Sequence, residues 1–175
     1  TGTSRLGATV ILSLGEVPIG LAVALFCKAP TLTVLPWVIC SGCTHFFYKF
    51  FLTYAYARGD LSRVYPLARG TAPLIVGVVS TLFLAEPLTP HQFIGVMVLG
   101  FGILMMAGGV LWGNENRKLI PFALGSACAT ATYTIIDGLG ARVSGDAAAY
   151  VAWVFVADGV IFTTVTLLWK GVDVL

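Results

Sequence analysis

The chain has 175 residues, of which 58% are hydrophobic and only 10% are charged, and its formal net charge at pH 7 is +2. Soluble domains carry about 25% charged residues, so this chain lacks the polar side chains that would cover a water-exposed surface. The mean hydropathy of +0.93 indicates an integral membrane protein. The sequence contains no basic block, which argues against nucleic acid as a partner.

The chain contains six stretches long enough to cross about 30 Å of hydrocarbon as helices of about 20 residues. The alternating pattern of membrane β-strands is absent, and the connections are short. The sequence therefore predicts an all-α, polytopic membrane helix bundle in which consecutive helices are antiparallel. The predicted helices are residues 6–26, 34–55, 64–84, 91–112, 119–139 and 148–170.

Several helix boundaries carry recognisable local signals. Thr89, Pro90 and Gln92 form a capping box that begins the fourth helix. Pro66 suits the first turn of the third helix, where its missing N–H costs nothing. The polar connector 113–118 is the expected seam between two halves of the protein.

Helix 119–139 has alanines at four-residue spacing, namely Ala123, Ala127 and Ala131. Small residues at this spacing let two helix backbones approach closely in lipid. Two interpretations stay open, internal packing and a homodimer contact, and internal packing is the simpler one.

An internal repeat is indicated by two acids and two lysines. A shift of 142 positions aligns Glu16 with Asp158 and Lys28 with Lys170. The two helices concerned would run in opposite directions, because four helices lie between them and consecutive helices alternate in direction. This pattern is typical of the inverted repeats of secondary transporters. It also predicts one helix before residue 1 and three helices after residue 175.

Residues 41–106 resemble the drug/metabolite transporter superfamily, EamA type. The resemblance rests on one polar run and on the helices that flank it, and residues 133–142 resemble the first helix of the second half in one bacterial subgroup. The matching residues are His45, Tyr48, Ala55-Tyr56, Gly59-Asp60-Leu61-Ser62, Val64-Tyr65-Pro66-Leu67-Ala68-Arg69-Gly70, Ala72-Pro73, Glu86, Leu88-Thr89, Gly95 and Gly100.

The resemblance implies ten helices in two inverted halves of five, related to the small EmrE-like bundles. Residues 1–112 would then be a first repeat that lacks its first helix, and residues 119–175 the truncated start of the second. On this reading the chain is a fragment that holds helices two to seven. Orientation stays open, because the distribution of Lys and Arg places connector 113–118 in the cytoplasm whereas the family precedent places it outside.

Ionisable residues at membrane depth mark candidate sites. His45 and Lys49 are four residues apart on one helix face. Lys49 can extend outward to the membrane surface or pair with Glu16, which lies at a similar depth. His45 can relay protons or be a hydrogen-bonded core histidine, and Asp158 should be buried or paired.

Arg69 also has two interpretations. It can recognise a substrate carboxylate or phosphate with help from the free N–H groups at the start of its helix, or it can anchor that helix at the headgroup level. Asp137 and Tyr133 share a helix face, where Asp137 can bind a substrate amine or hold a helix interface. The candidate substrate-binding or coupling residues are Arg69, His45, Lys49, Glu16, Tyr48, Tyr65, Tyr133, Asp137 and Asp158.

The sequence contains no nucleophile elbow, no P-loop and no metal-ligand set beyond the pair Cys40 and Cys43, which is better explained as apolar filler. We therefore expect no enzyme, cofactor or metal, but a gradient-driven permease or exporter of a small metabolite or drug. The alternative is a non-transporting membrane scaffold or accessory subunit. The expected location is a bacterial inner (plasma) membrane, while substrate, proton coupling and oligomeric state stay open.

Overall fold

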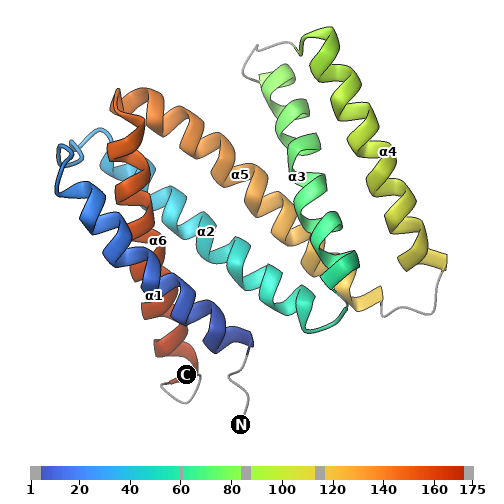
Figure 1. The fold of residues 1–175 in the computed structure, drawn as a ribbon, viewed down its shortest axis with the longest axis horizontal. Helices are drawn as coiled ribbons and strands as arrows, with labels where there is room; N and C mark the ends of the chain where they lie inside the picture. The colour runs from blue at the N-terminus through green and yellow to red at the C-terminus, as the bar shows by residue number, and fades with distance from the viewer. Residues whose placement is uncertain (1–4, 60, 84–87, 113–116, 172–175) are drawn as a thin grey trace. The chain divides into compact units, whose positions relative to one another are not determined.

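The computed structural model describes residues 5–59, 61–83, 88–112 and 117–171, and within them it is all-helical (Figure 1). The all-α prediction is confirmed, and each of the six predicted helices is present. A short 3₁₀ helix, η1 (Arg117–Leu119), precedes the fifth. The α-helices are α1 (Arg5–Ala24), α2 (Leu35–Tyr56), α3 (Leu61–Phe83), α4 (Pro90–Trp112), α5 (Ile120–Ser144) and α6 (Ala147–Lys170).

Four of the described segments are long and apolar enough to cross a membrane. These segments are Arg5–Ala24, Val64–Phe83, Arg117–Ser144 and Ala147–Lys170. The apolar stretch found within the described part of α4 is shorter, Pro90–Ile103. Helix α2 has 22 residues but is not in this set, and its His45 and Lys49 account for part of its lower hydropathy. Its polar face therefore requires partners from other helices.

The capping box at the start of α4 is confirmed. The Thr89 backbone N–H donates to Gln92 Oε1 over 2.8 Å, and the Gln92 N–H donates back to Thr89 Oγ1 over 3.4 Å. Pro90 is the first helical residue. The predicted end of the third helix, at residue 84, lies outside the described residues, as does most of connector 113–118.

The start of α3 differs from the prediction. The helix begins at Leu61, so Pro66 and Pro73 both lie inside it, and Pro66 is beyond the first turn. Its missing N–H therefore removes a hydrogen bond of the helix interior. The sequence signal was misleading because proline at a helix start and proline within a membrane helix look alike; neighbouring helices can compensate for the second.

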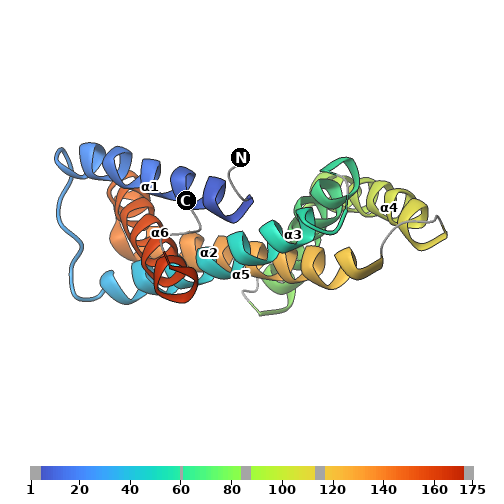
Figure 2. The same cartoon turned by 90° about the horizontal axis from the view of Figure 1, so that it is seen from below.

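The chain divides into two compact units. The first comprises residues 1–49 and 133–175, and the second comprises residues 50–132. In the first unit, α1 packs along α6 and runs in the opposite direction (Figures 1 and 2), as the repeat predicted. Residues at the start of α2 and on α6 form a small apolar core beside this helix pair. It includes Val38, Tyr150 and Val154, together with Val34, which directly precedes α2.

Two glycines allow α1 and α6 to approach closely. A Cβ atom on Gly20 would lie 2.7 Å from the Ala152 carbonyl oxygen, and a Cβ atom on Gly159 would lie 2.5 Å from the Ser13 carbonyl oxygen. Real Cβ atoms are not found at such distances from backbone oxygen. The backbones therefore meet directly, as small residues permit in a membrane.

The second unit contains α3 packed on α4, together with the ends of α2 and α5. Its core includes Ala55, Val64, Ala68, Leu119 and Ala123. The three spaced alanines of α5 are all buried, with Ala123 and Ala127 0% and Ala131 1% exposed. This burial agrees with the internal-packing interpretation.

We predict that Gly159→Ala destabilises the protein by about 1–3 kcal/mol, because the added methyl group must push α1 away from α6. Gly15→Ala on the exposed face of α1 is the matched control. No atom lies within 4 Å of its Cβ position, and alanine favours a helix over glycine by about 0.5–1 kcal/mol. Thermal unfolding of the purified variants, followed by circular dichroism, distinguishes them. Equal melting temperatures would contradict the close helix crossing.

Candidate functional site

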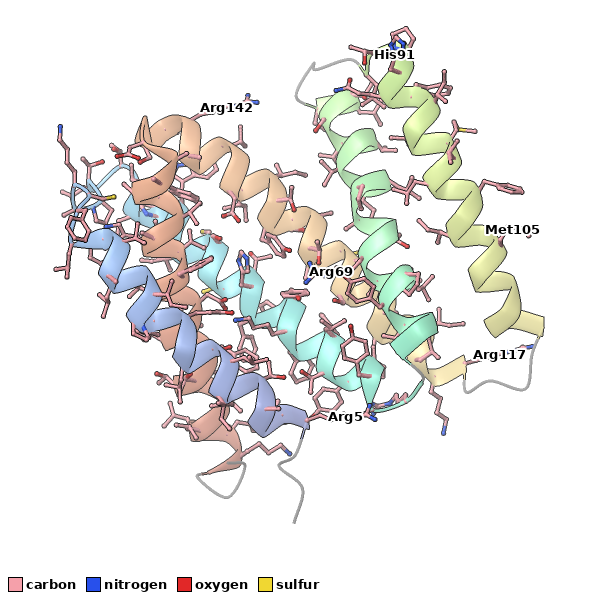
Figure 3. The ribbon with its side chains drawn as sticks, viewed as in Figure 1. Arg5, Arg69, His91, Met105, Arg117 and Arg142 are labelled. Atoms are coloured by element: carbon pink, nitrogen blue, oxygen red, sulfur yellow. The ribbon has the colours of Figure 1, made fainter. Side chains whose placement is uncertain are left out.

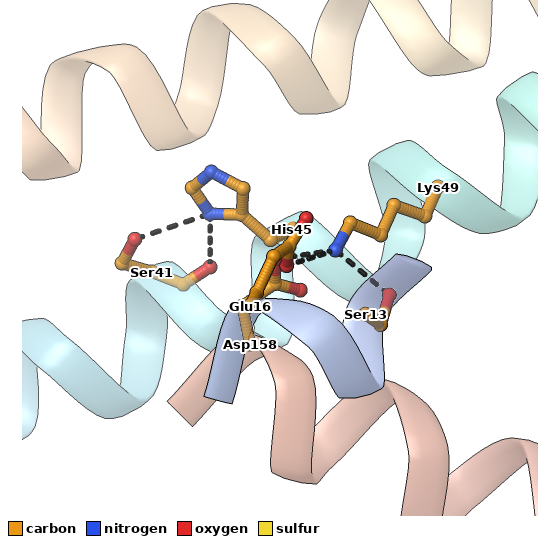
Figure 4. A network of polar contacts seen from close by, with 6 residues as sticks. All are labelled: Ser13, Glu16, Ser41, His45, Lys49 and Asp158. Carbon is orange, nitrogen blue, oxygen red and sulfur yellow. Dashed lines mark hydrogen bonds and ion pairs between the residues drawn. The ribbon is translucent and has the colours of Figure 1, made fainter. Parts of the chain in front are cut away.

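Lys49 forms the centre of a polar cluster in the first unit (Figure 4). Its ammonium nitrogen donates to Glu16 Oε2 over 2.6 Å, to Asp158 Oδ2 over 2.6 Å and to Ser13 Oγ over 2.9 Å. An ammonium group has three N–H donors, so these three acceptors match its full capacity. We call Ser13, Glu16, Lys49 and Asp158 the lysine cluster.

The two acids of the lysine cluster differ in how far they are shielded from solvent. The side chains of Asp158 and Lys49 are 5% and 10% exposed, whereas that of Glu16 is 30% exposed. Ion pairs at this degree of burial lose most of their hydration, and they persist because each charge finds an opposite charge and hydrogen bonds. The predicted pair between Glu16 and Lys49 is present, and Asp158 is both buried and paired as expected.

The close crossing of α1 and α6 positions both acids. Asp158 is the residue directly before Gly159, whose missing side chain brings α6 onto the backbone of Ser13. Glu16 follows Ser13 by nearly one helical turn, so both point to the same side of α1. Lys49 reaches them from α2. The two acids aligned by the repeat shift therefore meet at one lysine.

Three aromatic rings gather beside the lysine cluster: those of His45 and Tyr48, which precede Lys49 on α2, and that of Tyr133 on α5. The ring of His45 stacks on that of Tyr133 from α5, with centroids 3.9 Å apart and planes 24° apart. Tyr48 meets both rings edge-on, with centroid distances of 6.4 Å to His45 and 5.6 Å to Tyr133. The structure thus brings three of the predicted site residues into one group, which we call the ring cluster.

The hydrogen bonding of His45 fixes its neutral tautomer. Its Nδ1 atom lies 3.0 Å from the Ser41 carbonyl oxygen and 3.2 Å from Ser41 Oγ. A carbonyl only accepts, so Nδ1 carries the proton and donates it. In the neutral ring Nε2 is then an acceptor, which is the atom that would take up a proton or accept a bond from a substrate.

Asp137 holds a helix interface. The Tyr150 hydroxyl lies 3.1 Å from Asp137 Oδ1 and 3.4 Å from the Trp37 carbonyl oxygen. A hydroxyl has a single proton to donate. The Asp137 carboxylate is the better acceptor for it, because it is charged and lies closer. Asp137 therefore joins α5 to α6, as in the structural interpretation of this residue.

Arg69 and Tyr65 belong to the second unit. Arg69 lies partway along α3 (Figure 3), eight residues after the first helical residue, Leu61. The expectation that free N–H groups at the helix start support Arg69 is therefore wrong, because only the first four N–H groups of a helix lack partners. Tyr65 is 52% exposed.

Sequence reasoning missed Ser13, Tyr150 and Trp37. Ser13 lies three residues before Glu16, so its place on the same helix face was available from the spacing. No sequence signal identified Tyr150, because it pairs with Asp137 across the α5–α6 turn. Within the described residues no group of three metal-binding side chains occurs, and all four cysteines are free thiols.

Long apolar helices, antiparallel packing with direct backbone contact and a fully paired lysine among them define a polytopic α-helical membrane protein. The model of the EamA-like transporter family matches residues 3–108. The chain belongs to this family, whose members transport small molecules across membranes. No curated protein and no solved structure matches the chain.

We predict that Lys49→Met costs about 3–5 kcal/mol of stability, because it removes the cation that both shielded acids contact. Adding Asp158→Asn should recover part of this loss, so the double variant costs less than the sum of the single changes. Lys28→Met is the matched control at an exposed lysine and should stay within about 0.5 kcal/mol of the wild type. Unfolding in detergent is measured for the wild type, for the two single cluster variants, for their double variant and for the control. Equal losses at positions 28 and 49 would contradict a structural role of the cluster.

Proposed function

We propose that the chain is part of a secondary transporter that carries a small metabolite or drug by alternating access. Family membership supports transport of a small molecule. The single observation that carries the mechanism is the lysine cluster, where acids from α1 and α6 meet at Lys49. Charges held at membrane depth mark transport pathways far more often than structural sites.

The geometry of α1 and α6 supports an inverted repeat. The two helices run in opposite directions and contribute acids that the repeat shift aligns. In transporters built from inverted repeats, the site lies between the repeats near the membrane midplane, and the halves rock around it. The proposal assigns α1 to the first repeat and α6 to the second, as the domain prediction does.

The ring cluster is the proposed substrate surface. His45 offers a neutral acceptor, and His45 and Tyr133 form a stacked pair with Tyr48 at the edge. Flat rings with one oriented polar atom suit a small organic molecule. Recognition of a substrate carboxylate or phosphate by Arg69, in the second unit, remains a separate proposal, and Tyr65 remains a candidate residue of that unit.

A non-transporting scaffold is the rival function, and the two differ in access. A scaffold keeps its interior closed or open to one side, whereas a transporter exposes its site to each side in turn. The lipid bilayer is a partner in both cases. A bacterial inner membrane and a homodimer are compatible with either.

We predict that a cysteine at position 45 reacts with a membrane-impermeant thiol reagent from both sides of the membrane. The test uses His45→Cys in a chain whose four native cysteines are replaced by serine, in right-side-out and inverted vesicles. Lys28→Cys should react from one side only, because it lies in the connection between two helices. Ile11→Cys, on an exposed apolar face, should react from neither.

The reaction rates on the two sides are the measurement. Labelling of position 45 from one side only, or from neither, would contradict alternating access and favour the scaffold. Labelling of Lys28→Cys from both sides would show that the reagent crosses the membrane, and the vesicles would then be prepared again.

A further inference from the structure

The charges of the lysine cluster do not balance. Two carboxylates, Glu16 and Asp158, each lie 2.6 Å from one ammonium group. With all three groups ionised the cluster carries a net charge of −1. A net charge held away from water is costly, so the arrangement requires one further positive charge.

Asp158 offers a free position for that charge. Its Oδ2 atom accepts from Lys49, whereas its Oδ1 atom is buried and has no hydrogen-bond partner among the described residues. The side chain is 5% exposed. A buried carboxylate oxygen without a donor loses the stabilisation that water gave it, and a proton bound there removes this cost.

The neighbouring ionisable groups do not supply the missing charge. His45 donates its Nδ1 proton to Ser41, and Asp137 accepts from Tyr150, which leaves both outside the cluster. Tyr133 presents its ring to His45. No second lysine or arginine is paired with Glu16 or Asp158 in the described part of the first unit.

A metal cation fits this place poorly. The ammonium group of Lys49 already occupies the position between the two carboxylates. Hard cations take six or more oxygen ligands, and the described residues contain no group of three metal-binding side chains. A proton needs only one oxygen atom and no change of position.

We propose that Glu16 and Asp158 share one exchangeable proton, which makes the lysine cluster neutral while Lys49 keeps its own three protons. The proton comes from water, binds a carboxylate oxygen and returns to water; no other bond forms or breaks. The more exposed Glu16 is the exchange point and the buried Asp158 is the store. Resting on the proposed transport function, the cluster is the coupling site, because release of this proton leaves a charge that favours a more hydrated state.

Infrared spectroscopy of the purified full chain in lipid vesicles tests the shared proton. At neutral pH exposed Asp and Glu are ionised, so we expect one carbonyl band of a protonated carboxyl group, which shifts in deuterated buffer. Glu16→Gln and Asp158→Asn each leave one acid facing one lysine, so the band should disappear in both. Asp146→Asn is the matched control, since Asp146 caps α6 outside the cluster and asparagine caps equally well.

A second measurement does not depend on one variant folding. The folded cluster holds a proton that the unfolded chain lacks at neutral pH, so the stability it contributes should fall as pH rises. The melting temperature of the wild type should drop as the pH is raised from neutral, and that of Glu16→Gln should not. A band that persists in both cluster variants, no band in the wild type, or loss of the band on adding sodium ions would overturn the proposal.

The infrared and melting readouts need neither transport nor a known substrate. If the proton is absent while position 45 is labelled from both sides, the proposed function stands without this coupling site. If the proton is present while position 45 is labelled from one side, the site stands and alternating access fails.

Discussion

The contact of one ammonium group with two carboxylates organises the first unit of this protein. In lipid the hydrophobic effect does not drive helices together, so packing and polar contacts must do so. Lys49 links α2 to Glu16 on α1 and to Asp158 on α6 through three donors that are all used. Because each charge depends on the others for its solvation, the three helices are held by one interdependent set of contacts.

That contact depends in turn on glycine. The Ser13 carbonyl oxygen lies where a side chain on residue 159 would be, so any larger residue would separate the two helices that present the acids. Close packing and electrostatics are therefore a single constraint in this unit. A second polar contact between helices joins Asp137 on α5 to Tyr150 near the start of α6.

These constraints bear on function because they place chemistry between helices that the repeat assigns to different halves. Family membership identifies a transporter of small molecules. We propose the lysine cluster as the basis for coupling and the ring cluster as the basis for substrate contact. Both lie on one face of α2, where His45 and Lys49 are one turn apart. A charge change in the lysine cluster would thus act next to the surface proposed to bind substrate.

The sequence by itself determined the helices and the capping box of α4, because periodicity and caps are local properties. It placed Glu16 and Lys49 at a similar depth and spaced the alanines of α5 for close packing, but it left the partners of both open. It did not determine the start of α3, since proline is compatible with both a helix start and a helix interior. Only the tertiary structure decided that Asp158, 109 residues from Lys49, completes the cluster. Contacts between distant helices depend on how closely their backbones cross, and that distance is set by Gly159 and its neighbours together.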